Sequence, residues 1–119
     1  MQTQKSALGL DGNIAGLIGW IIGIVAIVLI FIEKDNKFVR FHAIQSVLFH
    51  VGFFVIYFAL SIVIVILAQI SSVFGFLGFL LLPLWLVWIG GMIFGAVKAY
   101  QGAMFKFPVI GGMAEKWSN

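Results

Sequence analysis

The side chains that could do chemistry lie together on one apolar segment, between residues 40 and 61. At 100° per residue of an α-helix, five of them fall within a sector of about 100°, and a sixth lies at its margin. With the arginine that precedes them they form what we call the polar stripe: Arg40, His42, Gln45, Ser46, His50, Tyr57 and Ser61. Unpaired polar groups in hydrocarbon are costly, so such groups face protein or a water-filled cavity. The stripe therefore predicts hydrogen bonds to neighbouring helices, or the lining of a path for a proton, an ion or a peptide.

The cluster of Arg40, His42 and Gln45 is the strongest candidate for a functional site, because it lies where the segment meets a charged loop. An arginine at this level can reach lipid phosphate or simply anchor the helix end. His42 and Gln45 have no such role, since an apolar residue would serve equally well at a helix start. We expect both to hydrogen-bond within the bundle or to line a polar cavity that faces the cytoplasm.

Other chemistry is disfavoured by what the sequence lacks. The chain has no cysteine, and its four acidic residues, Asp11, Glu33, Asp35 and Glu115, lie outside the apolar segments. No buried carboxylate pair is then available for acid–base catalysis, and two histidines eight residues apart do not complete a zinc ligand set. Glycines spaced by four in an apolar helix indicate packing, and not a nucleotide-binding loop. We predict no catalytic, cofactor-binding or metal-binding residues, and a protein that is not an enzyme.

Composition places the polar stripe in a membrane. The 119 residues are 63% hydrophobic and 9% charged, with a mean hydropathy of +1.19. Soluble domains are about 45–50% apolar and about 25% charged. The net charge of +3 would suggest nucleic acid in a soluble protein, but here we expect the basic residues to flank membrane helices. The sequence therefore predicts an integral membrane protein whose surroundings are lipid, with no nucleic-acid partner.

Three apolar segments predict an all-α bundle of three transmembrane helices in a single domain over residues 1–119. The spans are expected at about 13–32, 41–70 and 73–97, separated by a charged loop at 33–40 and followed by a tail at 98–119. The first apolar run, 14–32, would cover about 30 Å as a helix, which matches the hydrocarbon core. Pro83 should kink the third span. The tail is expected to carry a short interfacial helix that ends near Trp117.

Basic residues set the expected orientation, because lysine and arginine accumulate on the cytoplasmic side. With three spans, one side holds Lys5 alone. The other side holds six: Lys34, Lys37, Arg40, Lys98, Lys106 and Lys116. This bias predicts a multi-pass protein of the cell membrane with its N-terminus outside and its C-terminus in the cytoplasm.

Small residues indicate where the helices pack. On the first segment, five of them fall within about 80° of one another: Gly12, Gly16, Gly19, Gly23 and Ala26. Membrane helices associate by close backbone packing over such residues. This row is expected to pack against another helix of the chain or, alternatively, to join copies in a homo-oligomer. Gly91 and Gly95 on the third segment form a second, weaker pair.

Three stretches resemble a known family. They are residues 10–16, residues 32–46 with Phe-His-Ala-Ile-Gln-Ser at 41–46, and the tail at 99–102 and 107–111. Together they are similar to a family of small prokaryotic membrane proteins described as Tic20-like, after the chloroplast inner-envelope import component (UPF0132/DUF4870 type). The resemblance covers nearly the whole chain. It implies a helical membrane fold and, distantly, a role near protein translocation.

Two functions remain open from the sequence, with a third less favoured. The first is a non-enzymatic accessory or scaffold subunit that binds other membrane protein subunits, with protein translocation or insertion as a process that it could serve. The second is a small oligomeric transporter or channel whose path follows the polar stripe. The third is a pH sensor that uses the two histidines. Three helices enclose no conduit, so a pore would require oligomers or partners.

Overall fold

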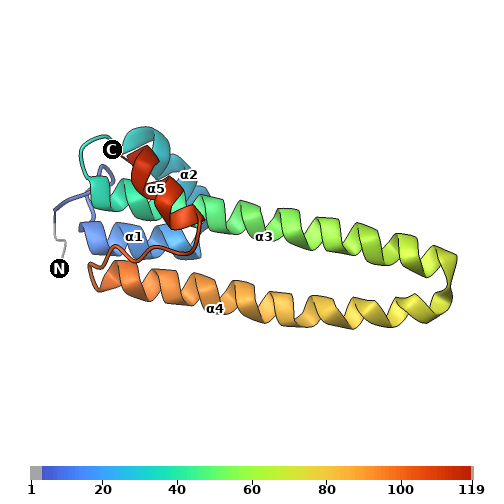
Figure 1. Ribbon diagram of the computed structural model, residues 1–119. Coiled ribbons are helices and arrows are strands. Elements are labelled where there is room, and N and C mark those ends of the chain that lie inside the picture. Colours follow the sequence, from blue (N-terminus) through green and yellow to red (C-terminus); the bar gives the residue numbers. More distant parts are fainter. Residues whose placement is uncertain (1–3, 119) are drawn as a thin grey trace.

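The computed structural model describes residues 4–118 and is helical throughout, apart from turns and loops (Figure 1). Within these residues the structure has no β-sheet, only one isolated bridge between Lys5 and Asp11. The expected all-α class is confirmed. In chain order the elements are α1 (Gly12–Ile21), α2 (Gly23–Ile32), α3 (Lys37–Ile70), the 3₁₀-helix η1 (Ser72–Leu80), α4 (Leu81–Tyr100) and α5 (Ile110–Ser118).

Two long helices form an antiparallel hairpin that sets the 56 Å length of the molecule. α3 contributes 34 residues, and η1 with α4 contributes 29, so both are long and apolar enough to cross a membrane. Asn36 caps α3, since its side-chain oxygen accepts from the Val39 amide at 3.2 Å. Pro83, where a kink was expected, lies in the first turn of α4, just after the helix type changes from the 3₁₀-helix η1.

Three transmembrane helices are not confirmed, because the first apolar run is not one helix. It is divided at Ile22, whose backbone is extended (φ −115°, ψ 99°), into the 10-residue helices α1 and α2. Each would reach only about 15 Å, half the hydrocarbon core. Continuous apolarity over 14–32 therefore did not produce a continuous helix.

The two ends of the described chain lie together, instead of on opposite sides as three spans would require. Asn36 donates through Nδ2 to the main-chain oxygen of Gln4 at 3.0 Å, which joins the N-terminal segment to the charged loop. Arg40 reaches the main-chain oxygen of Trp117 at 3.4 Å, which joins that loop to α5. Figure 1 shows both ends and the loop at the same end of the hairpin.

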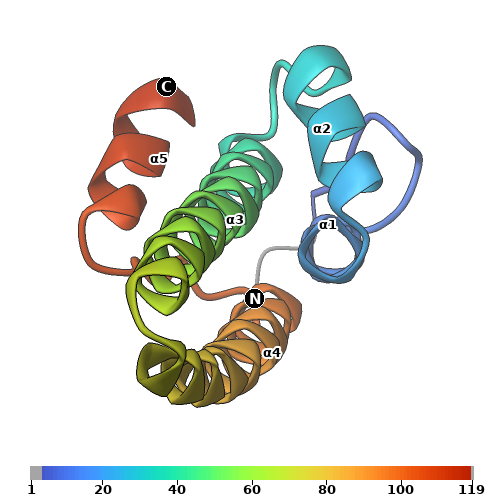
Figure 2. The same ribbon diagram turned by 90° about the vertical axis from the view of Figure 1, so that its right-hand side faces the viewer.

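The molecule divides into two regions, which we call the head and the stem. The head consists of α1, α2 and α5 around residues 37–50 of α3 and residues 91–100 of α4. The view along the hairpin shows α5 on one side of α3, α1 and α2 on the other, and α4 next to α1 (Figure 2). The stem is the remainder of the hairpin, residues 51–90. Three hydrophobic clusters fill the head, centred on Ala15, Trp20 and Phe41, whereas most apolar residues of the stem are exposed.

Candidate functional site

His42 lies inside the head, where its two ring nitrogens join three segments. The Trp20 indole donates from Nε1 to His42 Nδ1 at 3.0 Å, and His42 Nε2 lies 2.8 Å from the main-chain oxygen of Ala103. Since an indole can only donate, Nδ1 accepts and Nε2 carries the proton that goes to the carbonyl. His42 is 1% exposed, so the head holds it between α1 and the segment after α4.

His50 repeats this arrangement two helical turns further along α3. The Trp88 indole donates to His50 Nδ1 at 3.0 Å, and His50 Nε2 lies 3.1 Å from the main-chain oxygen of Trp20. The two units are connected, because Trp20 donates from its side chain to one histidine and accepts at its backbone from the other. Each histidine therefore links an indole to a backbone carbonyl.

These contacts explain why the first apolar run can stop at Ile22. A helix end leaves its last carbonyls without partners inside the helix, and lipid cannot supply any. At the end of α1, Ser46 Oγ donates to the oxygen of Gly19 at 2.8 Å and His50 bonds that of Trp20. The break at Ile22 is thus stabilised by two polar side chains from α3, more than 20 residues away.

Arg40 likewise donates hydrogen bonds to backbone carbonyls at two other helix ends. Its Nη1 donates to the oxygens of Ile30 and Glu33, at 3.0 and 2.7 Å, at the end of α2. Its Nη2 bonds the oxygen of Trp117 near the end of α5. A cation is favourable at a helix C-terminus because the carbonyls there carry partial negative charge. Arg40 therefore points into the head and not simply outward to phosphate.

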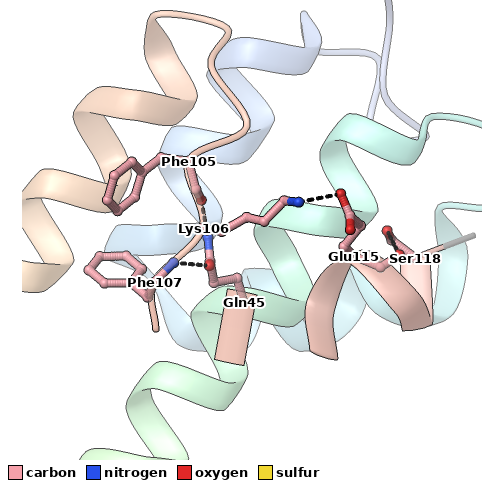
Figure 3. Close-up of polar contacts among 6 residues, drawn as sticks. All are labelled: Gln45, Phe105, Lys106, Phe107, Glu115 and Ser118. Atoms are coloured by element: carbon pink, nitrogen blue, oxygen red, sulfur yellow. Dashed lines mark hydrogen bonds and ion pairs between the residues drawn. The ribbon is translucent and has the colours of Figure 1, made fainter. Parts of the chain in front are cut away.

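Gln45 fastens the segment between α4 and α5, as the close-up shows (Figure 3). Its Nε2 donates to the oxygen of Phe105 and its Oε1 accepts from the amide of Phe107, both at 2.8 Å. The intervening Lys106 forms an ion pair with Glu115 of α5 at 2.7 Å. Gln45 is 1% exposed. Its side-chain amide donates one hydrogen bond to the backbone of this segment and accepts one from it, as the backbone of a neighbouring β-strand would.

The polar stripe does not continue into the stem as a network. Ser61 donates to the oxygen of Tyr57 at 2.8 Å, a bond within α3 itself. The Tyr57 ring packs against Phe53 and Trp85 at centroid distances of 5.8 and 5.3 Å. The five members from Arg40 to His50 are therefore brought together in the head, and Tyr57 and Ser61 are not.

The small residues on the first segment do not form one contact surface, because that segment is divided. A Cβ added to Gly12 would lie 2.8 Å from the oxygen of Gln4, and one added to Gly16 would lie 3.0 Å from Ala99 Cβ. At Gly19 the nearest atom would be at 3.6 Å, and Gly23 faces open space. Ala26 is fully buried. Only the first part of the predicted row packs tightly.

Gly91 and Gly95, the weaker pair in the sequence, have closer contacts than the glycines of the first segment. A Cβ on Gly95 would lie 2.5 Å from the Trp20 ring, and one on Gly91 would lie 2.5 Å from the Phe49 ring. The absent side chains leave room for two aromatic rings. α4 therefore uses glycine here to approach α1 and α3.

Sequence reasoning missed the partners of the stripe. Trp20 and Trp88 were not singled out, although a buried indole N–H requires an acceptor and a nearby histidine supplies one. Asn13 donates to the oxygen of Tyr100 at 3.1 Å, at the end of α4. Glu33 is 4% exposed and accepts from the amide of Ala7 at 2.7 Å. Asn13 and Glu33 lie at the borders of the first apolar run, and that position was the signal by which they could have been found.

The polar side chains of the head are thus bonded to backbone and indole groups. In the part of the chain that the structure describes, no buried side-chain nitrogen or oxygen lacks a hydrogen-bond partner. Over the same residues, no three His, Asp or Glu side chains come together as metal ligands would. The grooves on the surface are lined mainly by apolar residues.

Comparison with known proteins identifies the family. The sequence profile described as the magnetosome magnetite crystal formation protein family matches residues 5–114, so the chain belongs to that family. It is 41% identical over 116 residues to a UPF0132 membrane protein of Methanocaldococcus jannaschii, covering 97% of this chain and 96% of the relative. No solved structure matches the sequence.

Two further relatives carry the same name. A second UPF0132 membrane protein of M. jannaschii is 36% identical over 117 residues, which cover 93% of this chain and 73% of that protein. One from Archaeoglobus fulgidus is 36% identical over 105 residues, covering 87% and 92%. The resemblance to UPF0132 proteins is confirmed, and a membrane location fits these names and the two long apolar helices. The Tic20-like part of the resemblance is not shown.

Proposed function

We propose that this chain is a non-enzymatic accessory or scaffold subunit of the cell membrane, which binds other membrane proteins through its lipid-facing helices. One observation carries the proposal: the members of the polar stripe from Arg40 to His50 already make hydrogen bonds within the head. What remains for partners is the apolar surface of the stem, where Phe58 and Leu86 are 69% and 72% exposed. Translocation or insertion of other proteins is one process that such a subunit would serve.

A transporter or channel is the second candidate, because the stripe runs along α3. The ring nitrogens of His42 and His50, however, are all bonded to indoles and carbonyls. A proton or ion that passed along the polar stripe would have to break those bonds. A path lined by the stripe would also need polar groups in the stem, where Ser61 bonds only its own helix. These contacts favour the subunit over the conduit.

The family's name refers to magnetite crystal formation, and we do not extend that activity to this chain. A surface that orders an iron mineral would present free oxygen ligands. Here Asp11 and Glu115 pair with Lys5 and Lys106 at 2.8 and 2.7 Å. Glu33 is buried against backbone amides, which leaves the exposed Asp35 as the one remaining acid. The proposal therefore relies on the membrane architecture.

For the topology we propose two spans, α3 and η1 with α4, with both termini in the cytoplasm. This replaces the expected N-out arrangement, in which the N-terminus would lie opposite the charged loop. All seven lysines and arginines belong to the head or its loops, and residues 69–80 at the far turn carry no charge. Such a bias supports a position of the head on the cytoplasmic side. α1 and α2 would then enter the membrane surface from that side and return to it.

Single cysteines test the topology, since the chain has none of its own. Cysteines at Leu8, Val73 and Val109 are all placed at exposed positions. A membrane-impermeant maleimide added to intact cells should label Val73→Cys and leave the other two unlabelled until the membrane is opened. Labelling of Leu8→Cys from outside would overturn the two-span topology and favour the three-span prediction, in which the N-terminus lies outside.

Two measurements test the function. The protein, extracted in mild detergent, should run as a larger complex in native mass measurement, with defined membrane protein subunits. Proteoliposomes of the purified chain should carry no ion or proton flux above empty vesicles. A homo-oligomer that conducts, with no other subunit, would overturn the scaffold in favour of the channel.

A further inference from the structure

A groove on the head runs along α3 between α2 and α5. Figure 2 shows these two helices on either side of α3. The groove has a volume of about 260 Å³ and a mainly apolar lining: Ile30, Ile44, Val47, Leu48 and Trp117, with Arg40 as its charged member. Each of the three helices contributes part of it. The groove is therefore an apolar trough with one guanidinium, and nothing in the proposed function uses it.

Arg40 keeps part of its bonding capacity. A guanidinium has five N–H donors, and the contacts to the oxygens of Ile30, Glu33 and Trp117 use three of them. These bonds also fix the position of the charge. Two donors remain for a ligand, and a planar fork of this kind suits the oxygens of a phosphate.

The charges around the groove favour an anion. Lys37, one turn before Arg40, and Lys116, next to Trp117, are both exposed. Of the three acids in the neighbouring segments, Glu33 accepts from the amides of Ala7 and Asn36, and Glu115 pairs with Lys106. The third, Asp35, is exposed, and the adjacent Lys34 offsets its charge. The groove thus combines net positive charge with an apolar floor.

We propose that this groove binds one anionic phospholipid, with its phosphate on Arg40 and an acyl chain along Ile44, Val47 and Leu48. Trp117 is half exposed and forms a wall, and an indole at this level is typical of the membrane interface. A lipid fits better than a soluble phosphate because the trough continues from the charge as apolar surface. The site rests on the proposed topology, which puts the head at the cytoplasmic leaflet, where anionic lipids concentrate.

The test is lipid retention by the full-length protein in detergent, measured by native mass spectrometry. Phosphatidylglycerol and phosphatidylcholine with the same acyl chains are the two probes. The wild-type protein should hold one phosphatidylglycerol about tenfold more tightly, since charge-assisted hydrogen bonds contribute that much or more. Arg40→Gln, which removes the charge and leaves a shorter, neutral amide, should abolish the preference.

Two more variants separate the charge from the trough. Leu48→Trp should fill the groove and weaken both lipids about tenfold while Arg40 remains. Lys98→Gln is the matched control, because this lysine lies over the Phe94 ring, outside the groove, at 5.4 Å. It should leave the preference unchanged. Circular dichroism checks that each variant is folded. If Arg40→Gln does not fold, the lipid retention of Leu48→Trp tests the proposed site instead.

Three results would overturn the site. They are equal retention of the two lipids by the wild-type protein, an unchanged preference in every folded groove variant, and competition by glycerol phosphate as strong as by whole lipid. The last would show that the trough adds nothing to binding. The maleimide labelling described above is independent of lipid retention, so a failure of the topology and a failure of this site are distinguishable.

Discussion

The head and the stem are both helical, yet they are held together by different forces. In the head, side chains from α3 bond the backbones of α1, α2 and α5 and the segment after α4. In the stem, the described side-chain bond is local, from Ser61 to Tyr57, and residues such as Val65 are more than half exposed. The bond between Trp88 and His50 lies at the border between the two regions.

The difference shows how helices can be interrupted in so apolar a chain. Each end of a broken helix needs partners for its carbonyls, and the polar stripe supplies them from one continuous helix. The stem has no broken helix and needs no such partners, because lipid covers its apolar surface. Changes to the head should therefore be costly, and equivalent changes to the stem should be small.

The largest effect is expected for Gly95→Leu. Its Cβ would lie 2.5 Å from the Trp20 ring, so α1 and α4 must separate and the contact of Trp20 with His42 is lost. We expect a loss of about 3 kcal/mol or more in the free energy of unfolding, from overpacking plus an unpaired buried group. Thermal unfolding in detergent, followed by tryptophan fluorescence, measures it.

Gly90→Leu is the matched control for this variant, because nothing lies within 4 Å of its added Cβ. It should unfold at nearly the wild-type temperature. If the two leucine variants were equally stable, the close packing of α4 on Trp20 would be wrong.

The next effect is expected for His42→Leu, which leaves the indole N–H of Trp20 and the oxygen of Ala103 without a partner. Each buried unpaired group costs about 1–3 kcal/mol, so the variant should lose about 2–4 kcal/mol. Chemical denaturation in mixed micelles measures the loss. The comparison is Ser61→Ala in the stem, for which we expect less than about 0.5 kcal/mol. Similar losses for both would remove the distinction between head and stem.

Gln45→Leu should loosen the segment at 103–107 without unfolding the rest of the head. The amide of Phe107 donates to Gln45 Oε1, so its hydrogen exchange should become about tenfold faster, as expected when about 1.4 kcal/mol is lost. Mass-resolved hydrogen exchange reports on this directly. Gln69→Leu, at the exposed far end of α3, should leave exchange at 103–107 as in the wild type.

The smallest effect is expected at Val109, which is 80% exposed and has a φ of 68°. This left-handed conformation is unfavourable for a β-branched residue. Val109→Gly should therefore raise the stability of the head by about 0.5–1 kcal/mol, after the entropic cost of glycine. A lower unfolding temperature would mean that the valine side chain makes a contact that outweighs the strain.

The sequence alone indicated the class of protein and much of the candidate site. Composition required a membrane, and helical periodicity placed His42, Gln45, Ser46 and His50 on one face of one helix. Both conclusions depend on properties that each residue carries with it, namely its transfer free energy and its position every 100° around a helix.

Only the tertiary structure decided which groups His42, Gln45, Ser46 and His50 bind. Periodicity gives the direction of a side chain but not the group that it meets, and here the partners are backbone oxygens 27 to 61 residues away. The same bonds allowed the run 14–32 to stop at Ile22, although its apolarity and length suited a complete span. Because a helix end is stable in a membrane only when another segment satisfies it, neither the break nor the side on which the N-terminus lies could be predicted from that run alone.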